Sequence, residues 1–237
     1  MSIWATLAGT ALGLVIGGPL GALAGAAAGG AVDAARARAV GPERRRVAFT
    51  IAAIALAAKM ASADGVPSAA EFATFQRLFH VDPREAANAR RFYDLAKGSV
   101  AGFEAYAGQA ADLLGPGSAT LEDLLDALWM IAAVDGFDAA ELAFLERVAA
   151  LLGFDETAQA RIRRRHLAPA ADDPWAVLGV EPGTDAAAIR AAYHTLVKRY
   201  HPDRALAEGV PAEFIRVSES RMADINAAYD RLTGRRR

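Results

Sequence analysis

The sequence predicts an all-α protein, and three observations support this fold class. Hydrophobic residues make up 54% of the 237 positions, so the chain can bury a core. Alanine, the residue with the highest helix propensity, is abundant, whereas aromatic residues make up only 8% and β-branched residues are too sparse for a large sheet. Apolar residues also recur three and four positions apart, which is the spacing of one helix face.

Composition and missing motifs exclude several classes of function. The net charge is only −2, so no overall field favours a nucleic-acid partner. Cysteine is absent, which removes disulfides, thiol catalysis and cysteine-ligated zinc, and suits a reducing compartment. The chain has no G-x-x-x-x-G-K-[ST] loop, no G-x-S-x-G elbow and no H-E-x-x-H helix. We therefore expect a protein that is not an enzyme and that needs no cofactor.

Residues 1–41 are predicted to form a membrane anchor with a basic flank. No residue from Ile3 to Val32 is charged, and a helix needs about 20 apolar residues to cross a bilayer core. Five arginines lie between Arg36 and Arg46 and no lysine or arginine precedes the span, so the positive-inside rule places the N-terminus outside. This predicts a single-pass membrane protein with most of the chain in the cytoplasm. A cleaved signal peptide is the alternative, with small residues around Ala22–Ala31 as the cleavage site, although the start lacks a basic residue.

Glycine recurs every four positions along this span. On a helix this spacing makes a flat stripe along which two backbones can approach closely, as in GxxxG dimers. The stripe predicts self-association within the lipid, although a span rich in glycine and alanine can also produce the spacing by chance. Its members are Gly9, Gly13, Gly17, Gly21, Gly25 and Gly29.

Residues 42–167 are predicted to form a helical domain. One helix face is indicated by Val47, Ile51, Ile54 and Ala58, and another by the leucines from 121 to 128. The glycines at 98–102 and 115–117 are predicted to break helices.

This domain contains an internal repeat. Residues 57–65 and residues 128–136 are each an apolar helix that stops at Asp-Gly, and each is followed by a helix with an early glutamate. Glycine suits the left-handed end of a helix, and Ser68 and Asp138 are candidate caps for the helices that follow. Two such units predict a pseudo-symmetric bundle.

The repeat resembles the TerB-like domain, in which paired helices carry acidic residues after an Ala-Asp-Gly turn. The resemblance implies possible metal ligands at Asp64, Glu71, Asp135 and Glu141. Oxygen ligands of this kind suit Ca²⁺ or Mg²⁺. The alternative, which we favour, is that these acids cap helices and interact with helix dipoles, so that no metal is bound.

Residues 168–173 are a short Ala/Pro/Asp-rich linker, which could hold the last domain a modest distance from the bundle. In residues 174–237, Asp185 starts a helix that runs to Tyr200, with one face formed by Ile189, Tyr193, Leu196 and Tyr200. A second amphipathic helix presents Met222, Ile225, Tyr229 and Leu232. Pro202 ends the first helix, so we expect an antiparallel hairpin with a loop at its tip that carries the string His201-Pro202-Asp203.

This hairpin resembles the J domain of the DnaJ family over residues 174–237. The opening W-A-V-L-G-V, the string I-R-A-A-Y-H-T-L-V-K-R-Y-H-P-D and the string I-N-A-A-Y-D-R-L carry the resemblance. It implies docking on a DnaK-type chaperone and faster hydrolysis of the ATP bound to that partner. The implied contacts are the loop residues His201, Pro202 and Asp203 and the cations Arg190, Lys198, Arg199 and Arg204.

The order of the three zones is similar to that of the DjlA-type, membrane-anchored J-domain co-chaperones. It implies a co-chaperone that brings DnaK-type activity to the inner membrane. The alternative is a membrane-associated, ion-responsive or signalling scaffold in which the TerB-like region dominates. The intact His-Pro-Asp string favours the co-chaperone.

Overall fold

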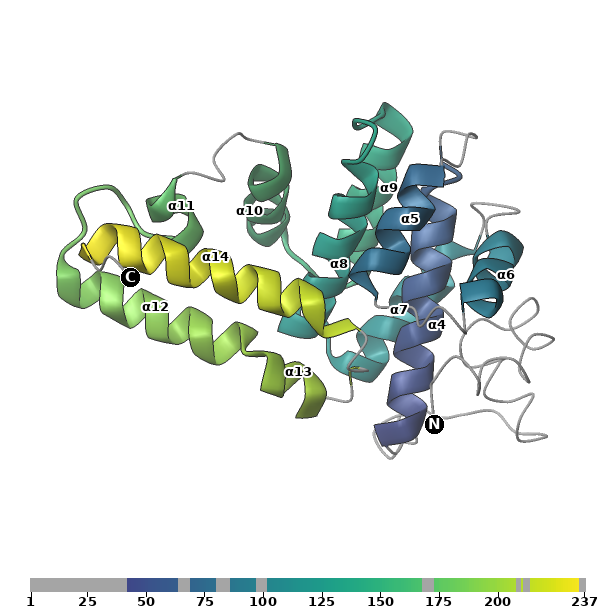
Figure 1. Ribbon diagram of the computed structural model, residues 1–237, viewed down its shortest axis with the longest axis horizontal. Coiled ribbons are helices and arrows are strands. Elements are labelled where there is room, and N and C mark those ends of the chain that lie inside the picture. Colours follow the sequence, from purple (N-terminus) through teal and green to yellow (C-terminus); the bar gives the residue numbers. More distant parts are fainter. Residues whose placement is uncertain are drawn as a thin grey trace.

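All the regular secondary structure in the described part of the protein is helical, as expected. A computed structural model describes residues 42–63, 69–79, 86–96, 102–167, 173–207, 210 and 214–234 (Figure 1). The predicted membrane anchor and its glycine stripe lie outside these residues. Within the described ranges, no helix is both long enough and apolar enough to cross a bilayer.

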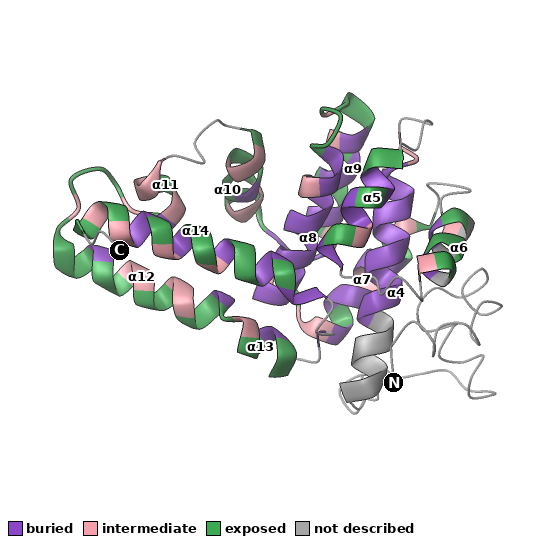
Figure 2. Ribbon diagram, in the orientation of Figure 1, coloured by how far each residue is buried: buried purple, intermediate pink, exposed green. Residues whose placement is uncertain are grey.

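The first body of the structure is a bundle built around α4 (Pro42–Met60). Every residue from Phe49 to Ala61 is buried, so the helix is covered on all sides and not only on the predicted face of Ile51, Ile54 and Ala58 (Figure 2). Small alanines on the remaining sides let its neighbours approach closely. The helices that pack against it are α6 (Ala86–Ala96), α7 (Phe103–Leu114), α8 (Ala119–Ala132) and α9 (Ala139–Leu151), and α5 (Ala69–Leu78) packs on α8.

The helix breaks that were predicted from glycine are confirmed where the structure describes them. Gly102 precedes α7 with φ 82°, and Gly115 follows that helix with φ 86°. Residues other than glycine rarely adopt positive φ values of this size. Ser118 then caps α8, because its hydroxyl accepts a hydrogen bond from the N–H of Leu121 at 3.3 Å.

The second copy of the repeat forms the predicted helix–turn–helix. Asp138 caps α9 by accepting from the N–H groups of Ala140 and Glu141 at 2.6 and 2.9 Å. Glu141 completes a capping box, since its carboxylate accepts from the N–H of Asp138 at 3.1 Å. In the first copy, Asp64, Gly65 and Ser68 lie outside the described residues.

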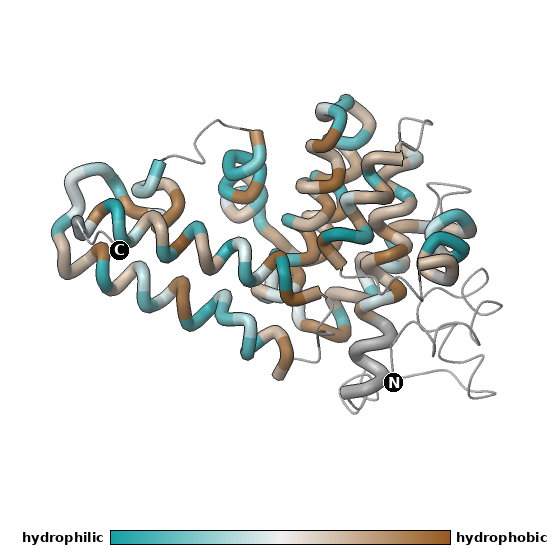
Figure 3. The backbone as a smooth tube through the Cα atoms, viewed as in Figure 1, coloured by the Kyte–Doolittle hydropathy of each residue, from teal (hydrophilic) through white to brown (hydrophobic). Residues whose placement is uncertain are grey.

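The C-terminal part forms the predicted antiparallel hairpin of α12 (Ala186–Tyr200) and α14 (Ile215–Thr233). The rings of Tyr193 and Tyr229 stack with centroids 4.1 Å apart, and hydrophilic and hydrophobic stretches alternate along both helices (Figure 3). Asp185 caps α12 by accepting from two backbone N–H groups at 2.8 Å. The short helix α11 (Pro174–Leu178) packs against α14.

The segment after α12 differs from the predicted loop. His201 is extended, with φ −62° and ψ 131°, and a short helix α13 (Pro202–Ala207) begins directly after it. Proline favours the first position of a helix, because its missing N–H is not needed there and its φ is already helical. Pro202 therefore ends one helix and begins the next.

The hairpin packs directly on the bundle and is not held at a distance from it, which differs from the role considered for the linker. The ring of Phe214, at the start of α14, lies between Phe49 and Phe79 of the bundle, at centroid distances of 4.9 and 4.6 Å. Ala119 of the bundle is in turn part of the apolar cluster of the hairpin. The helix α10 (Glu156–Leu167) packs on α8 and α9 of the bundle.

Candidate functional site

The His-Pro-Asp string lies at the junction of α12 and α13 and is open to solvent. The side chain of His201 is 50% exposed and that of Asp203 is 84% exposed. The N–H of Asp203 donates to Nδ1 of His201 at 3.2 Å, so the imidazole caps the first turn of α13. A neutral ring that accepts at Nδ1 carries its proton on Nε2, which leaves one N–H directed away from this contact.

The four predicted cations near this string are all exposed, but they are not arranged on a single face. At about 100° per residue, Lys198 lies roughly 80° around α12 from Arg190, and Arg199 lies roughly opposite Arg190. Arg190 and Lys198 therefore share one side of the helix, with Arg204 beyond the loop on α13. Arg199 is directed to the bundle, where its Nη2 lies 3.5 Å from Oε2 of Glu122.

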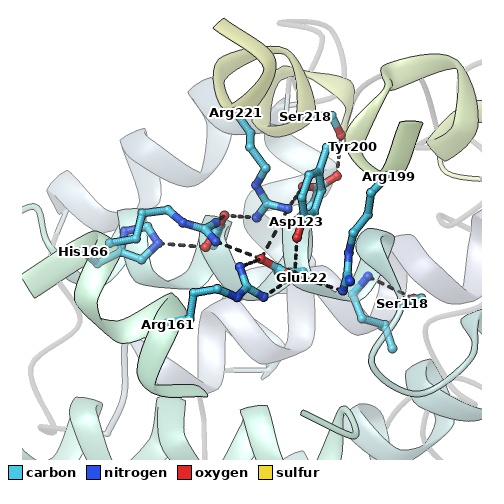
Figure 4. Close-up of polar contacts among 12 residues, drawn as sticks. Ser118, Glu122, Asp123, Arg161, His166, Arg199, Tyr200, Ser218 and Arg221 are labelled. Carbon is cyan, nitrogen blue, oxygen red and sulfur yellow. Dashed lines mark hydrogen bonds and ion pairs between the residues drawn. The ribbon is translucent and has the colours of Figure 1, made fainter. Parts of the chain in front are cut away.

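The contact of Arg199 belongs to a buried ion network that sequence reasoning missed. Its centre is Glu122 of α8, whose side chain is 0% exposed (Figure 4). Arg161 donates to both carboxylate oxygens, at 2.7 and 2.9 Å, and Arg165 donates to Oε1 at 2.9 Å. The hydroxyl of Tyr200 donates to Oε2 at 2.8 Å. Glu122 thus joins α10 to the end of α12.

Arg221 of α14 enters the same network from the hairpin. It pairs with Asp126, and its Nη1 lies 2.8 Å from Oδ1 of Asp123 and 3.8 Å from Oε1 of Glu122. Its guanidinium also lies 4.3 Å from the ring centroid of Tyr200. We call Glu122, Asp123, Asp126, Arg161, Arg165, Arg199, Tyr200 and Arg221 the Glu122 network.

Two neighbours complete the polar contacts around this network. The hydroxyl of Ser218 donates to Asp123 at 2.5 Å, and Nε2 of His166 lies 2.9 Å from Oδ1 of Asp126. Burial lowers the pKa of His166 to about 4, so its ring is neutral at pH 7 and Nε2–H can donate to Asp126.

The charges of the network keep its central carboxylate ionised. Burial alone would raise the pKa of Glu122, but the hydrogen bonds of Arg161 and the charges of Arg221 and Arg165 outweigh burial and hold that pKa far below its usual range. At Asp123 the balance is reversed, and burial raises the pKa. Burial also raises the pKa of Tyr200 to about 12, so its hydroxyl remains a hydrogen-bond donor at pH 7.

Of the four acidic residues named as weak candidates for metal ligands, the three that the structure describes belong to no metal-binding group. Glu71 is buried in α5, Asp135 is exposed in the turn after α8, and the carboxylate of Glu141 is engaged in the capping box. Asp64 lies outside the described residues. Among the residues that the structure describes, no group of three or more His, Cys, Asp or Glu side chains could hold a metal ion.

A sequence signal for the Glu122 network does exist. Glu122, Asp123 and Asp126 lie on the side of α8 away from its leucines, and Arg161 and Arg165 are four positions apart on α10. Each pattern alone is typical of a solvated helix face. Only the three-dimensional arrangement shows that these two faces meet each other and the hairpin.

Comparisons with known proteins give three consecutive matches along the chain. Residues 1–39 match the family model described as the transmembrane domain of the co-chaperone DjlA, and residues 50–164 match that of the tellurite resistance protein TerB. Residues 173–237 match the DnaJ domain.

Curated relatives are similar to part of the chain. The co-chaperone protein DjlA of Yersinia pestis is 36% identical over 72 residues, which are 30% of this chain and 26% of the relative. The protein of the same name from Escherichia coli (strain K12) is 37% identical over 62 residues, which are 26% of this chain and 23% of the relative. The chain thus covers about a quarter of the length of these relatives. No solved structure matches the chain.

Proposed function

We propose that this chain, a DjlA-like protein with a DjlA transmembrane domain, a TerB domain and a C-terminal J domain in that order, is a co-chaperone. It recruits a DnaK-type chaperone to the inner membrane and stimulates the ATPase of that partner. The observation that carries the proposal is the exposed His-Pro-Asp string at the tip of the J-domain hairpin.

The proposed mechanism assigns different tasks to the loop and to the cations. Arg190, Lys198 and Arg204 form a positively charged approach to the loop, and such charges chiefly raise the association rate with an acidic surface. His201 and Asp203 then make the short-range contacts, for which an imidazole N–H and a carboxylate are well suited. Pro202 fixes the backbone between them. Hydrolysis takes place in the partner, so this chain supplies no catalytic group.

Arg199 is assigned a second task in this proposal. It belongs to the predicted set of partner contacts, yet its guanidinium also forms an ion pair with Glu122 at 3.5 Å. Its side chain is still 45% exposed, so a partner can reach it without breaking the bundle contact.

The N-terminal segment is the proposed anchor, with its N-terminus outside the membrane. The charge asymmetry around residues 3–32 supports this orientation. The four-residue glycine spacing supports self-association, which would present two J domains beside one bilayer and raise their local concentration. Replacing Gly17 and Gly21 by leucine should lower dimerisation in a membrane reporter assay while the protein stays in the membrane. Unchanged dimerisation would contradict the proposed stripe.

The test of the co-chaperone function uses the full chain in lipid nanodiscs and a purified DnaK-type chaperone. We expect the chain to accelerate single-turnover ATP hydrolysis by the chaperone. His201→Gln and Asp203→Asn should each abolish the acceleration, because each removes a proposed short-range contact with the chaperone. Both side chains are exposed and contribute little to the fold, so the helical structure should be retained.

A matched control is His194→Gln, which changes an exposed histidine on α12 outside the loop. It should stimulate like the unchanged chain. If the loop variants stimulated as well as the control, the J domain would not act through its His-Pro-Asp string.

A further inference from the structure

The junction between the bundle and the J domain has an apolar part and an ionic part. In the apolar part, Phe214 is 3% exposed and packs against Phe49 and Phe79. In the ionic part, Arg221 is 7% exposed and faces the carboxylates of α8. Phe214 directly precedes α14 and Arg221 lies seven positions further along, about two helical turns, so the hairpin contacts the bundle at two separate points.

Glu122 connects this junction to the end of the helix that carries the loop. Its Oε2 accepts from the hydroxyl of Tyr200 at 2.8 Å and lies 3.5 Å from Arg199. These are the last two residues of α12, directly before His201. A fixed end of α12 therefore fixes the direction in which the His-Pro-Asp string leaves the helix.

The docked arrangement leaves the partner-facing groups open. Asp203 is 84% exposed, and both Arg190 and Lys198 are exposed, with Arg190 on the side of α12 opposite Arg199. The bundle thus contacts the J domain at Arg199 and Tyr200 and leaves the side chains of the loop exposed. The contact therefore does not block access of a partner to the loop, as an autoinhibitory contact would.

We propose that Glu122 of the TerB domain is a positioning residue for the J domain, which acts through Tyr200 and Arg199 to hold the His-Pro-Asp string in one orientation on the bundle. The inference rests on the proposed co-chaperone function. It assigns the TerB domain a part in chaperone engagement.

A fixed loop favours binding for an entropic reason. A loop that is already oriented loses less conformational freedom when a partner binds, so affinity rises without a new contact. Without the carboxylate of Glu122, Arg161 would lose the acceptor of both its hydrogen bonds, and the buried Arg221 would be left with only Asp123 and Asp126. The end of α12 would also lose the contact of Tyr200 with the bundle.

The test compares three single variants of the full chain in nanodiscs, together with the double variant Glu122→Gln/Tyr200→Phe. Glu122→Gln removes the central charge, and Tyr200→Phe removes only the hydroxyl that reaches it. Glu146→Gln is the matched control, because Glu146 forms an exposed ion pair with Arg163 on the same bundle. Hydrogen–deuterium exchange is measured over residues 198–207, and chaperone ATPase is measured against co-chaperone concentration.

For Glu122→Gln we expect faster exchange over residues 198–207, with exchange around Tyr193 unchanged. We expect the concentration of this variant that gives half-maximal stimulation of the ATPase to rise about 3- to 10-fold, because a less pre-organised loop lowers affinity for the chaperone. The maximal ATPase rate should be retained. Tyr200→Phe should shift both readouts in the same direction by a smaller factor. The double variant should add little to Glu122→Gln, because both changes remove the same contact. Glu146→Gln should change neither readout.

Three outcomes would overturn the inference. A lower half-maximal concentration in Glu122→Gln would mean that the contact restrains activity. An unchanged one, despite faster exchange, would mean that orientation is irrelevant. Unchanged exchange in both variants would mean that Glu122 does not hold the loop. If Glu122→Gln fails to fold, Tyr200→Phe decides alone. If the unchanged chain does not stimulate at all, the proposed function fails, and this inference fails with it.

Discussion

The two sides of α12 differ in how their charges are used. On the side toward the bundle, Arg199 and Tyr200 contact a carboxylate that is 0% exposed and shared with arginines of two other helices. On the other side, Arg190 and Lys198 are exposed. A buried charge pair strongly destabilises a protein when one partner is removed, whereas an exposed charge contributes little. One helix therefore combines a structural side and a side free for recognition.

The comparison also separates stability from function in the J domain. Groups that contact the bundle should determine whether the hairpin stays docked, and groups in the open loop should determine whether a partner responds. Variants on the two sides should accordingly differ in which measurement they change.

The largest effect on stability is expected at Phe214. Replacing it by alanine empties the space between Phe49 and Phe79, and buried Phe→Ala changes typically cost about 3–5 kcal/mol. Chemical denaturation followed by circular dichroism measures this loss. A cost below about 1 kcal/mol, as for a surface position, would show that the hairpin does not dock in this way.

Acid should destabilise the contact of α10 with α8, where His166 meets Asp126 and Trp129, with an effect on the order of 3 kcal/mol from His166 alone, given about 1.4 kcal/mol per pKa unit. Burial lowers the pKa of His166 from 6.5 to about 4, so the unfolded chain binds a proton more readily than the folded one. The stability that this ring contributes is therefore complete above about pH 6.5 and is lost as the pH falls toward 4. The depressed pKa of Glu122 continues the loss below that window, while Asp123, whose pKa burial raises, acts in the opposite direction.

Melting temperatures measured from pH 7.5 to pH 4 test this expectation. His166→Asn removes the titrating ring and should flatten the pH dependence between pH 6.5 and 4. An equally steep dependence in the variant would assign the acid sensitivity to other groups.

A smaller effect is expected at the cap of α9, away from the junction. Asp138→Ala removes an N-cap side chain that accepts two backbone hydrogen bonds, which typically costs about 1 kcal/mol of unfolding free energy.

Added Ca²⁺ or Mg²⁺ should leave the melting temperature of the unchanged chain the same, because the carboxylate of Glu141 is already hydrogen-bonded in the capping box. A metal-dependent rise in melting temperature that disappears in Asp135→Ala would favour the ion-responsive scaffold instead.

The smallest effect on stability is expected on the open side of α12. Arg190→Ala with Lys198→Ala should change the unfolding free energy by less than about 0.5 kcal/mol, since both side chains are exposed. The same variant should slow association with the chaperone at low salt and matter less at high salt, where screening is already strong. Stopped-flow association at two salt concentrations measures this. A large loss of stability would mean that these cations are structural.

Much of the helical layout could be predicted from local pattern. The cap at Asp185, the apolar face of α12, the break at Gly115 and the capping box at Asp138 each depend on a few neighbouring residues. Such features are local, so spacing alone predicts them. Two local expectations were incomplete. The helix α4 is buried on all sides because alanine allows close packing, and Pro202 begins a short helix as well as ending one.

The candidate site likewise has a part that could be predicted from local sequence and a part that could not. The string His201-Pro202-Asp203 and its place between two amphipathic helices could be predicted, because they are continuous in sequence. The Glu122 network could not be predicted, because its members come from α8, α10, α12 and α14. A carboxylate on a helix face has the same sequence pattern whether it meets water or, as Glu122 does, four arginines.

The sequence by itself determined the helices, their caps and the exposed motif of the J domain, since hydrogen bonding within a helix and apolar periodicity act over a few residues. Only the tertiary structure decided that the J domain rests on the TerB domain. Phe214 packs between two aromatic rings of the bundle, and Glu122 of α8 accepts a hydrogen bond from Tyr200 at the end of α12. The physical reason is that burial and ion pairing depend on which surfaces meet. Residues 78 positions apart, such as Glu122 and Tyr200, become neighbours only when the whole chain has folded.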